Sequence, residues 1–101
     1  MEIRRTTDGN TVTLELDGRL SAIAAPDLQR ELDAALEEFE NILLDMSKVE
    51  YISSAGIRAI LSTQKKILKK GNGKLSLIGL TQESREILEV TGMNTVLKID
   101  E

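Results

Sequence analysis

The sequence contains no cysteine and no histidine, and these two absences remove much of the chemistry that small enzymes use. Without cysteine the chain has neither disulfides nor thiolate metal ligands, and without histidine it lacks the commonest general base and metal ligand. A catalytic triad of serine, histidine and aspartate is therefore impossible. We expect a protein that is not an enzyme and that binds no cofactor or metal.

Aromatic residues are nearly absent as well, since Phe39 and Tyr51 are the only two. The apolar content is therefore aliphatic, which suits helices packed on a small sheet. The 17 acidic residues outnumber the 13 basic ones, giving a formal charge of −4. This balance argues against direct binding to nucleic acid, which needs clustered Lys and Arg side chains.

Long apolar runs are also missing. None approaches the length of a membrane span, and the first residues do not form a signal peptide. We therefore expect no membrane insertion and a cytoplasmic location. A chain of 101 residues is long enough for one domain with a single core, and no linker or internal repeat divides residues 1–101.

The residues that are present alternate between strand and helix patterns. Val12, Leu14 and Leu16 alternate with polar residues, as in a strand with one buried face, and the preceding Asp8-Gly9 is typical of a hairpin turn. The predicted order is β-β-α-β-α-β-α, followed by a last short strand or an extended tail. Strands are expected at 2–6, 11–16, 42–44 and 74–78, and helices at 26–39, 54–70 and 82–90, while residues 96–99 form the last short strand or the tail.

This order predicts an α/β fold with a small mixed, mainly parallel sheet of four to five strands flanked by helices. If the three central strands are parallel, the loops that follow them leave from the same edge of the sheet. Open α/β folds place their sites at this edge. We therefore expect the functional site among loops 18–25, 45–54 and 79–81.

Two adjacent serines, Ser53 and Ser54, stand where the second of these loops enters the long helix. A helix N-terminus presents unpaired N–H groups and a partial positive charge, so it favours a serine cap and tolerates a phosphate. From this pattern alone, a structural cap is the simpler interpretation.

Two other motifs suggest chemistry but fit it poorly. Asp45 ends a predicted strand and could act as a base or bind Mg²⁺, yet a lone carboxylate there is more often a loop or cap residue. Residues 71–74 (GNGK) superficially resemble a phosphate-binding loop. Their spacing is wrong and a strand follows instead of a helix, so we interpret them as a turn.

Residues 45–57, DMSKVEYISSAGI, resemble the signature of the STAS domain family, the anti-sigma factor antagonists. Supporting matches are GRL at 18–20, GKL at 73–75 and LEVTGM at 88–93, so the resemblance covers nearly the whole chain. The family fold, a small mixed sheet flanked by helices, agrees with the predicted order of elements.

The resemblance implies a partner-switching role. Aligned on Gly56, the phosphorylatable position of the family motif is Ser54. An anti-sigma factor with serine-kinase activity would bind the unphosphorylated form and release its sigma factor. Phosphorylation would end that binding, and a phosphatase would restore it. The candidate partner-binding residues around this position are Ser21, Ala22, Ile23, Ser53, Ala55, Gly56 and Arg58. Arg58 is included because it stands one helical turn after Ser54, where a partner contact and a solvated side chain are both open.

Two positions depart from the family pattern. The acidic residue usual before the phosphoserine is here Ser53, and the acidic residue common in the first loop is here Ser21. Either the partner kinase has a different charge pattern, or the domain binds without being phosphorylated.

A second hypothesis is a regulatory or assembly subunit of a transporter or a sensory complex, because STAS-like domains also occur there without a sigma factor. A small-ligand sensor that uses the same edge as a pocket is a third. Ala22, Ile23 and Ala24 are apolar for a loop, so they either pack under it or form an exposed docking patch. The sequence gives no strong signal for a homo-oligomer.

Overall fold

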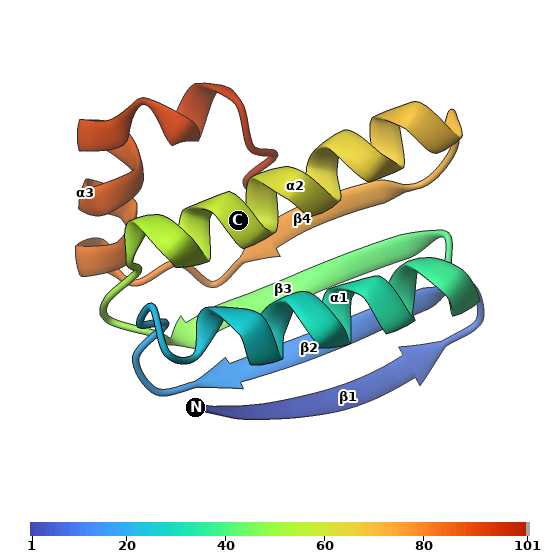
Figure 1. Ribbon diagram of the computed structural model, residues 1–101, viewed down its shortest axis with the longest axis horizontal. Coiled ribbons are helices and arrows are strands. Elements are labelled where there is room, and N and C mark those ends of the chain that lie inside the picture. The colour runs from blue at the N-terminus through green and yellow to red at the C-terminus, as the bar shows by residue number, and fades with distance from the viewer. Residues whose placement is uncertain (101) are drawn as a thin grey trace.

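Four strands and three α-helices alternate along the chain in the computed structural model, which describes residues 1–100 (Figure 1). Their order confirms the predicted β-β-α-β-α-β-α arrangement. Among residues 1–100, no helix combines the length and the apolar composition that spanning a membrane requires. The elements are β1 (Glu2–Asp8), β2 (Thr11–Asp17), α1 (Ala25–Glu38), β3 (Asn41–Lys48), α2 (Ser54–Lys70), β4 (Lys74–Ile78), α3 (Gln82–Thr91) and the 3-10 helix η1 (Met93–Thr95).

The strands form one sheet in the order β1-β2-β3-β4. β1 is antiparallel to β2, whereas β2, β3 and β4 are parallel, so the expected mixed and mainly parallel sheet is confirmed. The hairpin turn lies one residue later than predicted, at Gly9-Asn10, because Asp8 still pairs with Thr11 across the two strands.

The segment at 96–99 forms no strand. The chain returns to the sheet at Ile99, which makes a single parallel bridge with Leu77 of β4. Leu77 N donates a hydrogen bond to Lys98 O at 2.9 Å, and Asp100 N donates to Leu77 O at 2.8 Å. Leu97 is buried in the core, and the chain reaches β4 only at Lys98. Too few residues then remain alongside β4 to form a regular strand.

α1 and α2 pack side by side over one face of the sheet (Figure 1). The alternation along β2 decides which of its residues meet the helices: Val12, Leu14 and Leu16 are buried, and the residues between them are not. Burying each such aliphatic side chain contributes about 1.5–3 kcal/mol. The helices add aliphatic residues at helical spacing: Leu28, Leu32 and Ala35 from α1, and Ile57, Ile60 and Ile67 from α2.

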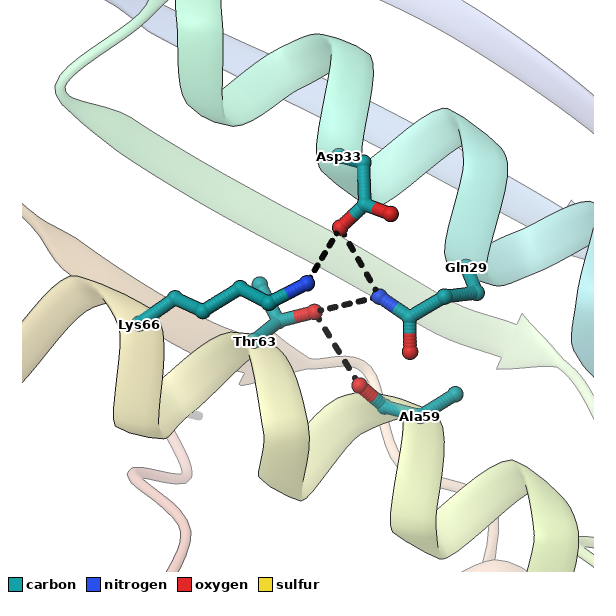
Figure 2. A network of polar contacts seen from close by, with 5 residues as sticks. All are labelled: Gln29, Asp33, Ala59, Thr63 and Lys66. Atoms are coloured by element: carbon teal, nitrogen blue, oxygen red, sulfur yellow. Dashed lines mark hydrogen bonds and ion pairs between the residues drawn. The ribbon is translucent and has the colours of Figure 1, made fainter.

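A polar network also ties α1 to α2 (Figure 2). Thr63 is buried on α2, where its hydroxyl donates to Ala59 O at 3.0 Å and accepts from Gln29 Nε2 at 3.4 Å. Asp33 Oδ1 accepts from the same Gln29 amide at 3.0 Å and from Lys66 Nζ at 2.9 Å. These bonds set how the two helices lie along each other.

Hydrogen bonds connect the start of α3 to the loop between β3 and α2. Val49 O accepts hydrogen bonds from Thr81 Oγ1 at 2.8 Å and from Ser84 Oγ at 2.6 Å. Thr81 also caps α3, since its hydroxyl accepts from Ser84 N at 3.1 Å. The start of α3 therefore supports the loop that leads into α2.

We predict that Ser84→Ala lowers the free energy of unfolding by about 1 kcal/mol, because the buried bond from Ser84 Oγ to Val49 O is lost. Denaturant unfolding followed by circular dichroism measures the change. Ser47→Ala is the matched control, since Ser47 is exposed and its hydroxyl has no partner among residues 1–100. The control should alter stability by less than about 0.5 kcal/mol. Equal losses in both variants would contradict the role given to Ser84.

Candidate functional site

The loops after β2, β3 and β4 leave from one edge of the sheet, as predicted, because these strands are parallel. The first two loops are joined directly: Leu20 N donates to Tyr51 O at 3.0 Å, and Ser53 N donates to Leu20 O at 2.8 Å. Beside these bonds, the Arg19 guanidinium lies over the Tyr51 ring, 4.4 Å from its centroid. The two loops therefore form one platform on which α2 begins.

Ser53 is the N-cap of α2. Its backbone is extended, and its Oγ accepts a hydrogen bond from Gly56 N at 3.0 Å. The residue is only 8% exposed. Ser53 therefore satisfies one of the unpaired N–H groups at the helix start and has little surface left for a partner.

Ser54 is the first residue of α2, and it is exposed. Its hydroxyl makes no hydrogen bond within residues 1–100. The first turn of α2 contains no acidic residue, so α2 itself supplies no carboxylate to offset the partial positive charge of its N-terminus. Ser54 thus presents a free hydroxyl where a phosphate group would be electrostatically favoured.

Gly56 is buried and allows α2 to approach the first loop closely. A Cβ atom at this position would lie 2.6 Å from Leu20 Cγ and 2.8 Å from Leu20 Cδ2. Gly56 therefore acts as a spacer beneath Ser54, and its own surface is covered.

The loop before α1 supplies the second group of predicted residues. Ser21 is half-buried, and its Oγ accepts from Ala24 N at 3.2 Å, so it shapes the start of α1. Ala24 is buried, whereas Ala22 and Ile23 are exposed, with Ile23 leaving 90% of its surface in solvent. Of the two arrangements left open for this loop, the structure has Ala22 and Ile23 in an exposed patch and Ala24 beneath it.

A groove between α1 and α2 connects the two groups. Ala22 lines it beside α1, and Ala55 and Arg58 line it on α2. Pro26 and Ser62 also line this groove and were missed by the sequence reasoning. The spacing of four from Arg58 to Ser62 is the signal that would have placed Ser62 on the same helix face.

The structure therefore divides the predicted site residues by their position. Those that reach the surface are Ala22, Ile23, Ser54, Ala55 and Arg58. Those that shape the backbone beneath it are Ser21, Ser53 and Gly56.

Asp45 does not end a strand, because β3 continues to Lys48 in partnership with Asp17 of β2. Its Oδ1 accepts from Ser47 N at 3.0 Å, which supports the local backbone. Among residues 1–100, no group of three or more His, Cys, Asp or Glu side chains is placed to hold a metal ion. Residues 71–73 form the predicted turn, and Lys74 is already the first residue of β4.

We expect the adjacent serines to respond differently to alanine. Ser53→Ala removes the cap and should lower the free energy of unfolding by about 1 kcal/mol. Ser54→Ala should change it by less than about 0.5 kcal/mol, because an exposed and unbonded hydroxyl is removed. Denaturant unfolding of both variants measures the difference. If Ser54→Ala lowers the free energy of unfolding as much as Ser53→Ala does, the assignment of the cap to Ser53 is wrong.

The solved structures with a similar fold include SpoIIAA in both an unphosphorylated and a phosphorylated form. The anti-sigma factor antagonist SpoIIAA in its unphosphorylated form superposes with a TM-score of 0.80 at 16% identity, over 99% of this chain and 89% of that chain. The phosphorylated form of the Bacillus SpoIIAA gives a TM-score of 0.74 at 14% identity, over 99% and 92% of the two chains. A sulfate transporter family protein from Wolinella succinogenes gives 0.78 at 23% identity, over 93% and 79%.

Sequence comparison identifies the family. The BtrV protein of Bordetella bronchiseptica, named provisionally as an anti-sigma factor antagonist, is 33% identical over 85 residues, which cover 83% of this chain and 72% of that protein. The sequence pattern of the STAS domain matches residues 2–101. Together with the mixed sheet, the two covering helices and the serine pair at the start of α2, this match shows that the chain belongs to the STAS domain family.

Proposed function

We propose that this chain is an anti-sigma factor antagonist that acts by partner switching. Its unphosphorylated form binds an anti-sigma factor with serine-kinase activity, which then releases its sigma factor. Phosphorylation of Ser54 ends that binding, and a phosphatase restores it. The observation that carries the proposal is the exposed Ser54 hydroxyl, unbonded within residues 1–100, beside a serine that already fills the cap position.

Two of the comparisons support this proposal. BtrV, the relative that is 33% identical, carries the provisional name of an anti-sigma factor antagonist. SpoIIAA shares the fold and has been solved in both unphosphorylated and phosphorylated forms. We further propose that the chain performs no catalysis of its own, uses no cofactor and works in the cytoplasm, where an anti-sigma factor would meet it.

A phosphate on Ser54 would act at the surface and leave the fold intact. It adds about −1.5 to −2 charges and three acceptor oxygens to a face that must dock closely. The N-terminus of α2 and the Arg58 side chain, one helical turn further on, both favour a negative charge at this position. The domain is thus expected to stay folded while the bulk and charge at Ser54 oppose docking.

The serines that replace the family's acidic residues keep the local structure but change the charge. Ser53 Oγ accepts from Gly56 N, and Ser21 Oγ accepts from Ala24 N. A carboxylate would accept the same kind of backbone bond. The replacements therefore retain these backbone bonds and leave the edge less negative, so we expect a partner kinase with fewer cations facing it.

We predict that Ser54→Ala abolishes phosphorylation by the partner kinase while binding is retained. Ser54→Glu should weaken binding about tenfold or more, or about 1.4 kcal/mol, because a fixed negative charge occupies the docking face. Intact-mass analysis after incubation with the kinase and ATP measures phosphorylation, and calorimetry measures affinity. Ser47→Ala, an exposed serine outside α2, is the control and should behave as the wild type.

Two results would contradict the switch. If the wild type gains no phosphate, the switch is removed although binding can remain. If Ser54→Ala is still phosphorylated, the modified residue is another one.

The alternative is a regulatory or assembly subunit of a transporter, and one comparison favours keeping it. The sulfate transporter family protein from Wolinella succinogenes shares the fold over 93% of this chain. A pull-down with nucleotide present separates the two functions. An ATP-binding serine kinase supports the first, whereas a membrane-transport ATPase supports the second.

A further inference from the structure

α2 carries a charge opposite to that of the rest of the protein. Its sequence, SAGIRAILSTQKKILKK, contains five basic residues and no acidic one. Since α2 contributes +5 and the whole chain has a formal charge of −4, the remaining residues carry −9. A cationic helix on an acidic domain therefore distinguishes one face of the molecule electrostatically.

Two of the five cations are engaged within the fold. Lys66 Nζ contacts Asp33 Oδ1 at 2.9 Å, as Figure 2 shows, and Lys70 Nζ donates to Leu36 O at 3.1 Å. Both bonds reach across to α1. These two lysines therefore help hold the helices together.

The other three cations have no such partner. Arg58, Lys65 and Lys69 are exposed and make no ion pair within residues 1–100. Their spacings of seven and four place them on one side of a helix. That side begins at Ser54, which lies four residues before Arg58.

Apolar side chains lie between these cations. Leu61 and Leu68 are seven residues apart on the same side, and Leu68 leaves 70% of its surface exposed. A hollow runs along the helix and is lined by Leu61, Ser62, the ion-paired Lys66 and the three unpaired cations. We call this surface, formed by Arg58, Leu61, Lys65, Leu68 and Lys69, the α2 outer face.

We infer that the α2 outer face binds an acidic amphipathic segment of the partner protein. Carboxylates of that segment would pair with Arg58, Lys65 and Lys69, and its apolar residues would cover Leu61 and Leu68. The inference rests on the proposed function for the identity of the partner. The α2 outer face would be a second contact region, which continues from Ser54 along α2 and sets which anti-sigma factor is recognised.

Charge complementarity favours a protein over an anionic membrane or a nucleic acid. A membrane surface or a nucleic acid extends well beyond three cations and would also meet the charge of −9 on the rest of the domain. A short acidic segment would contact only the α2 outer face. A phosphate on Ser54 would compete with that segment for Arg58, so phosphorylation would also weaken binding at the α2 outer face.

The test compares two charge reversals of equal size. Lys65→Glu with Lys69→Glu alters the α2 outer face, and Lys74→Glu with Lys98→Glu alters exposed lysines outside α2. We expect the first pair to weaken binding to the anti-sigma factor identified by pull-down about tenfold or more, and the second pair less than about threefold. Lys65→Gln with Lys69→Gln removes the same two positive charges without adding negative ones. Thermal melts of every variant check that each one remains folded.

A second measurement does not depend on the native partner. The ¹⁵N-labelled domain is titrated with a synthetic helical peptide that has Glu on one side and Leu on the other, and with the same peptide carrying Lys in place of Glu. We expect saturable shifts along Arg58, Leu61, Lys65, Leu68 and Lys69 with the acidic peptide alone.

The outcomes separate the inference from the proposed function. If the anti-sigma factor binds but both charge reversals act equally, the α2 outer face is not the recognition surface and the proposed function stands. If no anti-sigma factor binds the wild type, the proposed function fails and the peptide titration decides the inference. Peptide-induced shifts elsewhere on the domain overturn the inference. Binding of the wild type to phosphatidylserine vesicles that is lost on Lys65→Glu with Lys69→Glu also overturns the inference.

Discussion

Leu20 exchanges two backbone hydrogen bonds with the loop that leads into α2, and the geometry of the site depends on this contact. The bonds extend the parallel pairing of β2 and β3 beyond the strands, as the bridge between Leu20 and Ile52. Gly56 permits the contact, because a side chain there would overlap Leu20. These contacts place the loop before α1 directly beside the start of α2, where the groove between the two helices begins.

This arrangement gives the two neighbouring serines different surroundings. Ser53 turns inward and satisfies the helix N-terminus, so Ser54 does not need to cap α2 and can face solvent. Its hydroxyl then lies at the positive end of a helix whose first turn contains no acidic residue. A modification at Ser54 can therefore change the surface without changing the core, which is the physical requirement of a switch that acts by binding.

The charges are divided in a similar way. Packing against α1 engages Lys66 and Lys70, and the other three cations of α2 make no ion pair within residues 1–100. The acidic remainder of the domain favours a partner whose acidic contact is confined to α2. Ser54 and the α2 outer face belong to one continuous side of the helix, so the proposed phosphorylation site and the proposed recognition surface lie next to each other.

The order of the elements, the parallel sheet edge and the serine pair could all be predicted from sequence, because alternation, helical spacing and capping preferences act over a few residues. Which serine caps α2 was decided by tertiary structure, since either hydroxyl suits a helix start and the bond from Ser53 N to the distant Leu20 O sets the register. The bridge at Ile99 likewise depends on where Leu97 enters the core. Lysines that look equivalent in the sequence differ only because α1 lies on one side of α2 and solvent on the other.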